Sequence, residues 1–150
     1  MTSLAKVARR RIRKVLVPHI ESRGFVGKHP NFQREEGDQL HLLAIVYDKH
    51  GGGFALEFAR TAPGPFDPSW GETVPQRELE IGHTPPETRA RLVRTARGSG
   101  VYEDFFRFDE RAMDEAACTL LIEDAVEKFE QVDEWLRSGT KGENIAPYGV

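Results

Sequence analysis

Five histidines and one cysteine are the side chains of this sequence that most directly invite a search for catalysis or metal binding. They are His19, His29, His41, His50, His83 and Cys118. No two of the histidines stand four residues apart with a glutamate between them, which is the spacing that a zinc protease helix needs. Cys118 lies on an apolar stripe, where a free cysteine behaves as a small hydrophobe. We therefore expect no metal site, no cofactor and no catalytic cysteine.

A second set of side chains can do chemistry only if the fold brings its members together. Trp70 and His83 belong to a proline-rich segment, 61–86, whereas His41 and Glu57 lie on expected strands. A small enzyme with its site under that segment is one hypothesis, and a structural role for His41 is the simpler one. The glycines at 51–53 join two strands rather than a strand and a helix, so they do not predict a phosphate loop.

The strongest positive signal is a basic run at residues 6–14. Residues 1–34 carry nine cations and one anion, whereas residues 109–138 carry ten carboxylates and three cations. On a helix the basic run would spread cations widely enough to engage several phosphates or carboxylates, with Arg9, Arg10 and Arg13 as candidate binding residues.

Three interpretations of this charge separation remain open. The basic helix can pair with the acidic final helix of the same chain, bind a protein partner, or bind nucleic acid. Surface ion pairs contribute only about 0–1 kcal/mol each, but they would occupy the basic surface. No set of aromatic residues accompanies the basic run, as a protein that binds single strands would require.

The elements that must position these residues begin with a helix over 3–23, which Ser3 caps, Pro18 bends and Gly24 ends. Strands are expected at 32–35, 40–47 and 54–59, the last two joined as a hairpin, with weaker strand patterns at 77–81 and 89–94. A final helix begins at Asp109 and ends at Ser138-Gly139. The side chains expected to form one core are Phe54, Leu56, Phe58, Ile122, Phe129 and Leu136.

Together these elements predict an α+β fold of two layers. An antiparallel sheet of about four to six strands would be packed by a long N-terminal helix and a long C-terminal helix. We expect one domain over 1–138 and a flexible tail over 139–150. The 61–86 segment is expected to act as a flap that Phe66 or Trp70 anchors against the sheet.

The composition favours a globular protein of the cytoplasm. The chain has 150 residues, of which 39% are hydrophobic and 30% are charged. It has no apolar run long enough for a membrane span, and no apolar segment follows the charged N-terminus as in a secretory signal. We therefore expect no membrane association, while the oligomeric state stays open.

One stretch resembles an uncharacterised bacterial family whose domain has no known function. The resemblance rests on Gly24-Phe25-Val26-Gly27-Lys28, on Asn31-Phe32-Gln33-Arg34, and on the hairpin that closes at 54–58. It covers residues 10–60 best, and then 120–137. The family has a helix with a late proline, Gly-Phe-x-Lys and Asn-Phe-x-Arg stretches, an antiparallel sheet and a C-terminal helix. Where it often has an asparagine late in the hairpin, this chain has Glu57.

The resemblance implies a bacterial cytosolic protein, and families of this kind include immunity-like partners of toxins. It brings no catalytic residues. Our leading hypothesis is a non-enzymatic protein-binding domain with an immunity- or antitoxin-like role. The alternatives are a nucleic-acid-associated protein that uses the 6–14 helix, and the small enzyme with a site under the 61–86 segment. The candidate binding residues are Arg9, Arg10, Arg13, His41, Glu57, Trp70 and His83.

Overall fold

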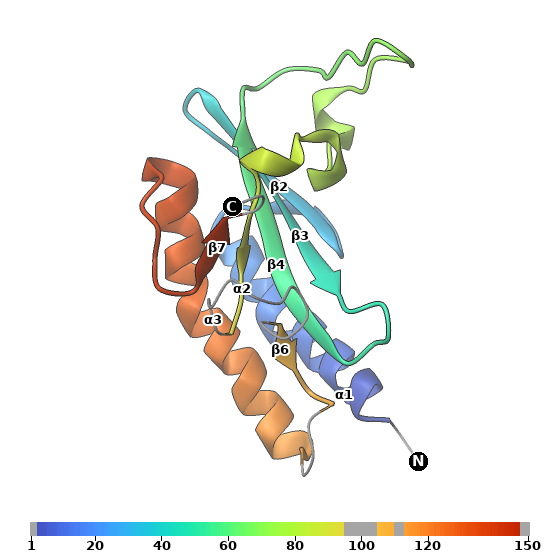
Figure 1. Ribbon diagram of the computed structural model, residues 1–150, viewed down its shortest axis with the longest axis vertical. Helices are drawn as coiled ribbons and strands as arrows, with labels where there is room; N and C mark the ends of the chain where they lie inside the picture. Colours follow the sequence, from blue (N-terminus) through green and yellow to red (C-terminus); the bar gives the residue numbers. More distant parts are fainter. Residues whose placement is uncertain (1–2, 95–104, 110–112, 148–150) are drawn as a thin grey trace.

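An antiparallel sheet, one N-terminal helical stretch and one C-terminal helix make up the α+β fold (Figure 1). The computed structural model describes residues 3–94, 105–109 and 113–147. The strands are β1 (Val26–Lys28), β2 (Asn31–Glu36), β3 (Gln39–Tyr47), β4 (Gly53–Thr61), β5 (Ala90–Leu92), β6 (Phe106–Arg107) and β7 (Ile145–Pro147). Their order is β1-β2-β3-β4-β5-β7, and β6 also pairs with β4. The sheet therefore has more strands than the four to six expected.

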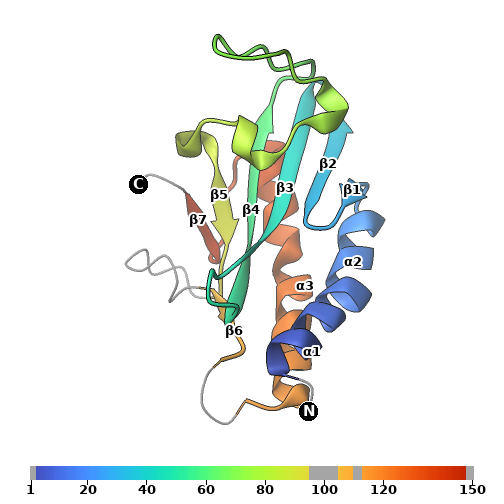
Figure 2. The ribbon, with the colours of Figure 1, turned by 90° about the vertical axis from the view of Figure 1, so that its right-hand side faces the viewer.

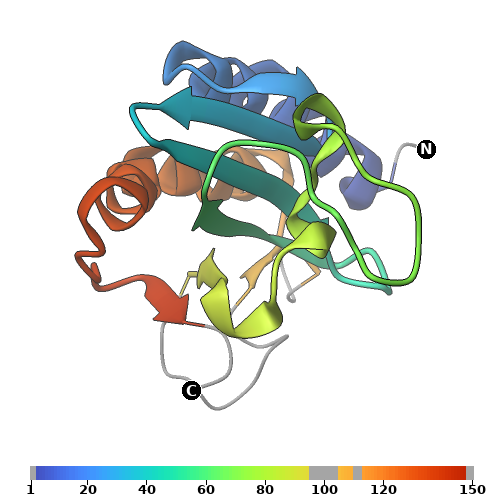
Figure 3. The ribbon, with the colours of Figure 1, turned by 90° about the horizontal axis from the view of Figure 1, so that it is seen from above.

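The helical elements are α1 (Leu4–Arg11), the π-helical segment η1 (Ile12–Leu16), α2 (Val17–Ser22) and α3 (Glu115–Ser138). Three 3₁₀ turns, η2 (Gln76–Glu78), η3 (Ile81–His83) and η4 (Pro86–Thr88), lie between β4 and β5. Figures 2 and 3 show α1, α2 and α3 on one side of the sheet and the segment 62–89 on the other side.

The π-helical segment has a cause in the sequence. Ala8, Ile12, Leu16 and Ile20 are fully buried at intervals of four residues. An α-helix has 3.6 residues per turn, so each step of four drifts by about 40° around the axis. The wider turn of η1, in which the Val17 N–H donates to the Ile12 carbonyl, reverses this drift and keeps the stripe on the sheet. The expected bent helix is thus a helical stretch from 4 to 22 with an irregularity just before Pro18.

The main core lies between these helices and the sheet. Phe25 and Phe129 meet edge to face there, with ring centroids 6.2 Å apart. All six side chains expected in one cluster belong to it: Phe54, Leu56, Phe58, Ile122, Phe129 and Leu136. Cys118 is fully buried in the same cluster, and burial raises the pKa of its thiol. The cysteine therefore packs as a hydrophobe.

The segment 62–89 covers part of the opposite face of the sheet. Phe66 pairs with Val74 through two backbone hydrogen bonds and packs against a small cluster of buried leucines. Those leucines are Leu40, Leu42 and Leu79. Phe66 is thus the anchor that the sequence predicted for this segment, whereas Trp70 is 83% exposed.

Three expectations from the sequence differ from the structure. The segment 77–81, expected as a strand, contributes η2 and the start of η3. The final helix begins later than expected, because Asp114 rather than Asp109 accepts a hydrogen bond from the Ala117 N–H at its N-terminus. Asp109 instead pairs with Arg107.

The C-terminal segment is the third difference. Residues 139–150 were expected to form a flexible tail; 148–150 lie outside the described residues, and within 139–147 β7 pairs with β5 in the register Leu92↔Ile145. Asn144 fixes the approach to β7, because its amide nitrogen donates to the carbonyls of Val93 and Arg94. Ile145 is fully buried in the main core. This strand therefore belongs to the domain.

Across the described ranges, no helix combines the length and the apolar character that a membrane span requires.

Candidate interaction surface

A buried ionic network ties the end of α2 to β2 and α3. Asp133 is 1% exposed and lies 2.7 Å from Arg34 Nη1 and 2.6 Å from Arg23 Nη2. Arg34 Nη1 also donates to the Arg23 carbonyl. Since the carboxylate and the Arg34 guanidinium are both buried and paired, the loss of either partner would leave an uncompensated buried charge, and the network offers no free group for chemistry.

His41 is part of this network and is fully buried. Arg34 Nε and Nη2 both donate to His41 Nδ1, so His41 Nε2 carries the proton and donates to the Gln39 side chain at 2.9 Å. Burial and the neighbouring Arg34 charge lower the pKa of His41 from 6.5 to about 4. Both ring nitrogens are therefore occupied, and the ring is neutral at pH 7.

Glu57 lies on the other face of the sheet from His41. It is paired with Ala44 across the strands, whereas its neighbours Leu56 and Phe58 face the helices. The carboxylate contacts Arg89 at 3.3 Å and Arg91 at 3.2 Å. Glu57 and His41 are thus separated by the sheet itself.

Trp70 and His83 do come together. They line one groove of about 470 Å³ beside Phe66, Pro68 and Pro85. His83 Nδ1 accepts a hydrogen bond from the Glu80 N–H. The groove, which Glu72 also lines, therefore joins two of the four residues of the small-enzyme hypothesis and leaves His41 and Glu57 outside it.

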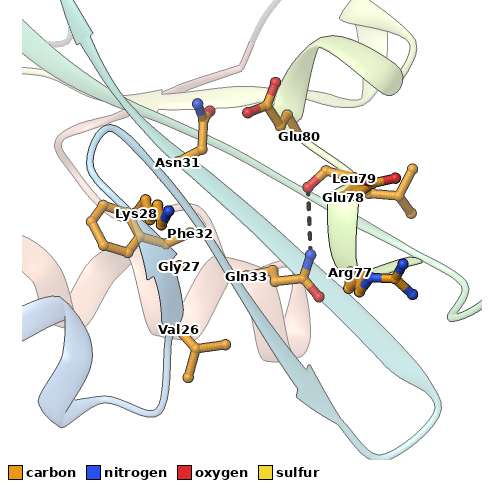
Figure 4. A pocket seen from close by; sticks show the side chains of 10 residues that line it. All are labelled: Val26, Gly27, Lys28, Asn31, Phe32, Gln33, Arg77, Glu78, Leu79 and Glu80. Carbon is orange, nitrogen blue, oxygen red and sulfur yellow. Dashed lines mark hydrogen bonds between the residues drawn. The ribbon is translucent and has the colours of Figure 1, made fainter. Parts of the chain in front are cut away.

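A second cavity, of about 380 Å³, lies between the β1–β2 hairpin and η2 (Figure 4). Gln33 reaches across it and donates to the carbonyls of Gln76 and Leu79. The charged residues at its rim are mixed in sign: Lys28, Arg77, Glu78 and Glu80. The mixed rim therefore favours neither an anionic nor a cationic ligand.

The basic run forms an exposed surface on α1 and η1. We call it the basic face, and its six members are Lys6, Arg9, Arg10, Arg11, Arg13 and Lys14, all exposed. No ion pair joins any of them to a carboxylate in the part of the chain that the structure describes; the cations that do bridge to α3 or from it are Arg23, Arg34 and Arg137. The basic face is therefore not neutralised by the acidic helix.

The acidic helix lies directly beside the basic face. α3 packs against α1 and η1, and Figure 2 shows the two helical stretches running side by side. On the side of α3 away from the core, an acidic stripe is exposed: Glu123, Glu127, Glu130 and Glu134. The helical side of the molecule thus presents two neighbouring stripes of opposite charge.

One cluster connects the basic face to the sheet. The Arg9 guanidinium carbon lies 4.3 Å from the centroid of the Tyr47 ring. The Tyr47 hydroxyl and His29 Nε2 are 2.7 Å apart, which is a hydrogen-bond distance. Burial and the charges of Arg13 and Arg9 lower the pKa of His29. A neutral imidazole therefore sits in the positive field of two arginines.

Two of these features could not be predicted from the sequence. Arg9, His29 and Tyr47 come from three elements, so only the register of the sheet could have placed them together. The contacts of Arg107 could not be predicted either, because it lies 2.9 Å from Asp48 and 2.6 Å from Asp109 only in the folded chain. A Cβ atom on Gly52 would lie 2.2 Å from the Asp109 carboxylate, so a larger residue here would have to displace that side chain.

Within the described ranges there is no group of three or more metal-ligating side chains, and no buried side-chain nitrogen or oxygen lacks a hydrogen-bond partner. The titratable groups of the interior are thus held in structural contacts.

Comparison with known proteins finds no matching family model, no matching curated protein and no matching solved structure.

The residues on which the sequence resemblance rests have structural roles here. Gly24 has a φ of 93° at the end of α2, and Gly27 has a φ of 146° where a Cβ would lie 2.4 Å from the Asn31 carbonyl oxygen. Phe25 and Phe32 are buried in the main core, and Arg34 pairs with Asp133. These residues of the motif therefore have a role in folding, and the stretches 26–28 and 31–33 also line the cavity between the β1–β2 hairpin and η2.

Proposed function

We propose that this chain is a non-enzymatic protein-binding domain that docks through its helical side, with an immunity- or antitoxin-like role as the concrete form of that function. In this proposal the domain has two layers, a sheet and a layer of long helices, and both charged stripes belong to the helical layer. The observation that carries it is the exposed basic face, which no carboxylate of the described chain neutralises.

The state of the interior supports a binding role over an enzymatic one. His41 has both ring nitrogens occupied, and Glu57 is held between two arginines. A general base needs a free lone pair within reach of a substrate. Of the four residues that the small-enzyme hypothesis requires, only Trp70 and His83 share a groove.

The neighbouring acidic stripe supports a protein partner over nucleic acid. Packed helices lie about 8–10 Å apart, so a duplex seated on the basic face would bring its phosphates close to the carboxylates of α3. A protein surface can instead present opposite charges to both stripes, which speeds association and fixes its orientation. The exposed cations are nevertheless the one observation that favours nucleic acid, so the test includes it.

The experiment is affinity capture from an extract of the cells that express the chain. The protein is compared with an Arg9→Glu, Arg10→Glu, Arg13→Glu variant and with a control variant that carries Lys49→Glu, Arg77→Glu and Lys141→Glu. Both variants change the net charge equally. We expect one protein to be retained by the wild type and by the control, and to be lost from the first variant. Equal retention by both variants would exclude docking through the basic face.

Two further measurements address the role and the alternative. An immunity-like role predicts that the captured protein arrests growth when expressed alone and is harmless when co-expressed with this chain. Nucleic-acid association predicts that a fluorescent duplex binds with an affinity that falls steeply between about 50 and 200 mM salt. Duplex binding without capture of a protein would replace the proposed function with the nucleic-acid alternative.

A further inference from the structure

We propose that Arg9, Arg13, His29 and Tyr47 form a binding site for a single oxyanion, a carboxylate or a phosphate group. Only the origin of this oxyanion rests on the proposed function. It would be an acidic side chain or a phosphorylated residue of the partner protein. The four side chains are called the oxyanion cluster below.

The geometry of the cluster is defined by contacts between three elements. Arg9 and Arg13 are separated by four residues along the helical stretch, so they lie about one turn apart on neighbouring positions of its surface. His29 lies in the turn between β1 and β2, and Tyr47 is the last residue of β3. Tyr47 joins them, because its ring lies under the Arg9 guanidinium and its hydroxyl lies 2.7 Å from His29 Nε2.

The cluster has donors but no anion of its own. The charges that act on His29 are those of Arg13 and Arg9, and the same two arginines act on Tyr47. No carboxylate of the described residues is among them. Arg9 and Arg13 are exposed, whereas His29 and Tyr47 are half-buried, so an anion can approach from solvent and meet a partly dry floor. Guanidinium groups are suited to this role because their planar donors match carboxylate and phosphate oxygens.

The Tyr47 contact also orders one of the donors. A free arginine side chain loses rotamer freedom when it binds, and the cation–π contact has already fixed Arg9 over the ring. Arg10 and Lys14 are also exposed and four residues apart on the same stretch, but neither has a contact of this kind within the described structure. They provide a matched pair of control positions.

The test is a titration of the full chain with inorganic phosphate at constant ionic strength, with chloride as the reference salt. Binding is monitored through the NMR signals of the His29 ring. We expect a saturable shift of the His29 signals and a rise in the pKa of His29 when phosphate is bound, because the anion offsets the two arginine charges. The Arg9→Gln, Arg13→Gln variant should bind at least about tenfold more weakly. The Arg10→Gln, Lys14→Gln variant, with the same net charge, should bind as the wild type does.

Equal weakening by both variants would show that phosphate only condenses on a basic helix, and it would overturn the site. A response no larger than that to chloride would overturn it as well. The same titration with a glutamate-rich peptide identifies the source: a shift with both probes supports a carboxylate ligand, and a shift with phosphate alone supports a phosphoryl ligand. Because no partner is needed, phosphate binding without protein capture would contradict the proposed function and leave the oxyanion site standing.

Discussion

Asp133 is a single carboxylate that holds two arginines from different parts of the chain. Arg34 comes from β2 and Arg23 from the end of α2, and both contacts are shorter than 3 Å. The sequence could indicate that His41 was structural, and it is, but it could not pair Arg34 with an aspartate 99 residues away. Long-range ion pairs leave no periodic pattern, so they become visible only after the helix has been placed on the sheet.

Replacing Asp133 should therefore be costly. Asp133→Asn leaves the buried Arg34 charge without its counter-ion, and we expect a loss of about 3–5 kcal/mol in the free energy of unfolding, measured by urea denaturation. Glu130→Gln is the control, because Glu130 also contacts Arg23 but its side chain is 65% exposed. That change should cost at most about 1 kcal/mol. Similar losses for both variants would contradict the buried network.

His41 should make stability depend on pH. Its pKa is about 4 in the folded protein and 6.5 as an ordinary histidine, so the unfolded chain binds the proton more strongly. The contribution of His41 to the free energy of unfolding is fully present above about pH 6.5. It declines as the pH falls toward about 4, by up to about 3 kcal/mol. The His41→Gln variant should lose this dependence, and His50→Gln should keep it. Equal pH profiles for His41→Gln and the wild type would contradict this assignment.

Among the elements, those with a strong periodic pattern were predicted well. The α3 stripe and the β3–β4 hairpin were both evident, because their apolar residues recur at helical and strand spacing. The short strands β6 and β7 were not, since two or three residues carry no period and form only beside an existing strand. The helix start was misplaced because Asp109 and Asp114 both suit a cap; in the structure Asp114 caps α3 and Asp109 pairs with Arg107.

The α3 stripe gives a test of the core. Phe129 is fully buried and meets the rings of Phe25 and His19 edge to face. Phe129→Ala should lower the free energy of unfolding by about 3–5 kcal/mol. Leu120→Ala, on the same helix but 66% exposed, should change it by no more than about 0.5 kcal/mol. A denaturation midpoint that Phe129→Ala leaves unchanged would be incompatible with this core.

The segment 62–89 gives a second test. In a Trp135→Phe background, Trp70 should show the red-shifted, easily quenched emission of an exposed indole. Phe66 should nevertheless hold the segment in place, because it packs on Leu40 and Leu42. Limited proteolysis between 62 and 75 should therefore be slow in this background and faster after Phe66→Ala. Blue-shifted emission, or cleavage that Phe66→Ala does not alter, would contradict this arrangement.

At the scale of the whole molecule, positive and negative charges lie on separate surfaces, and among the described residues the basic face does not pair with the acidic stripe of α3. The sequence predicted the separation, since it depends only on which residues are present. It left open whether the basic run pairs with the acidic helix, because that depends on how two adjacent helices are rotated about their axes. In the structure the cations and the carboxylates of the neighbouring stripes both face solvent.

The basic face should thus contribute little to stability. Reversing three of its charges, as Arg10→Glu, Arg13→Glu and Lys14→Glu, should change the free energy of unfolding by no more than about 0.5 kcal/mol in high salt. Arg23→Glu, which breaks the contact with Asp133, should be strongly destabilising. A salt-sensitive loss above about 2 kcal/mol in the triple variant would show that the basic face is paired with α3 in solution.

The π-helical segment also determines how α1 is rotated about its axis relative to α2. Each residue of an α-helix turns the chain by about 100°, so removing one residue from η1 would rotate α1 by roughly that angle relative to α2. Arg9 would then leave Tyr47, and Val7 and Ala8 would leave the core for the solvent. Which side of α1 meets the sheet and which meets a partner is therefore decided by the length of one turn. A single-residue insertion or deletion there would turn a different side of α1 toward the sheet without altering the chemistry of any side chain.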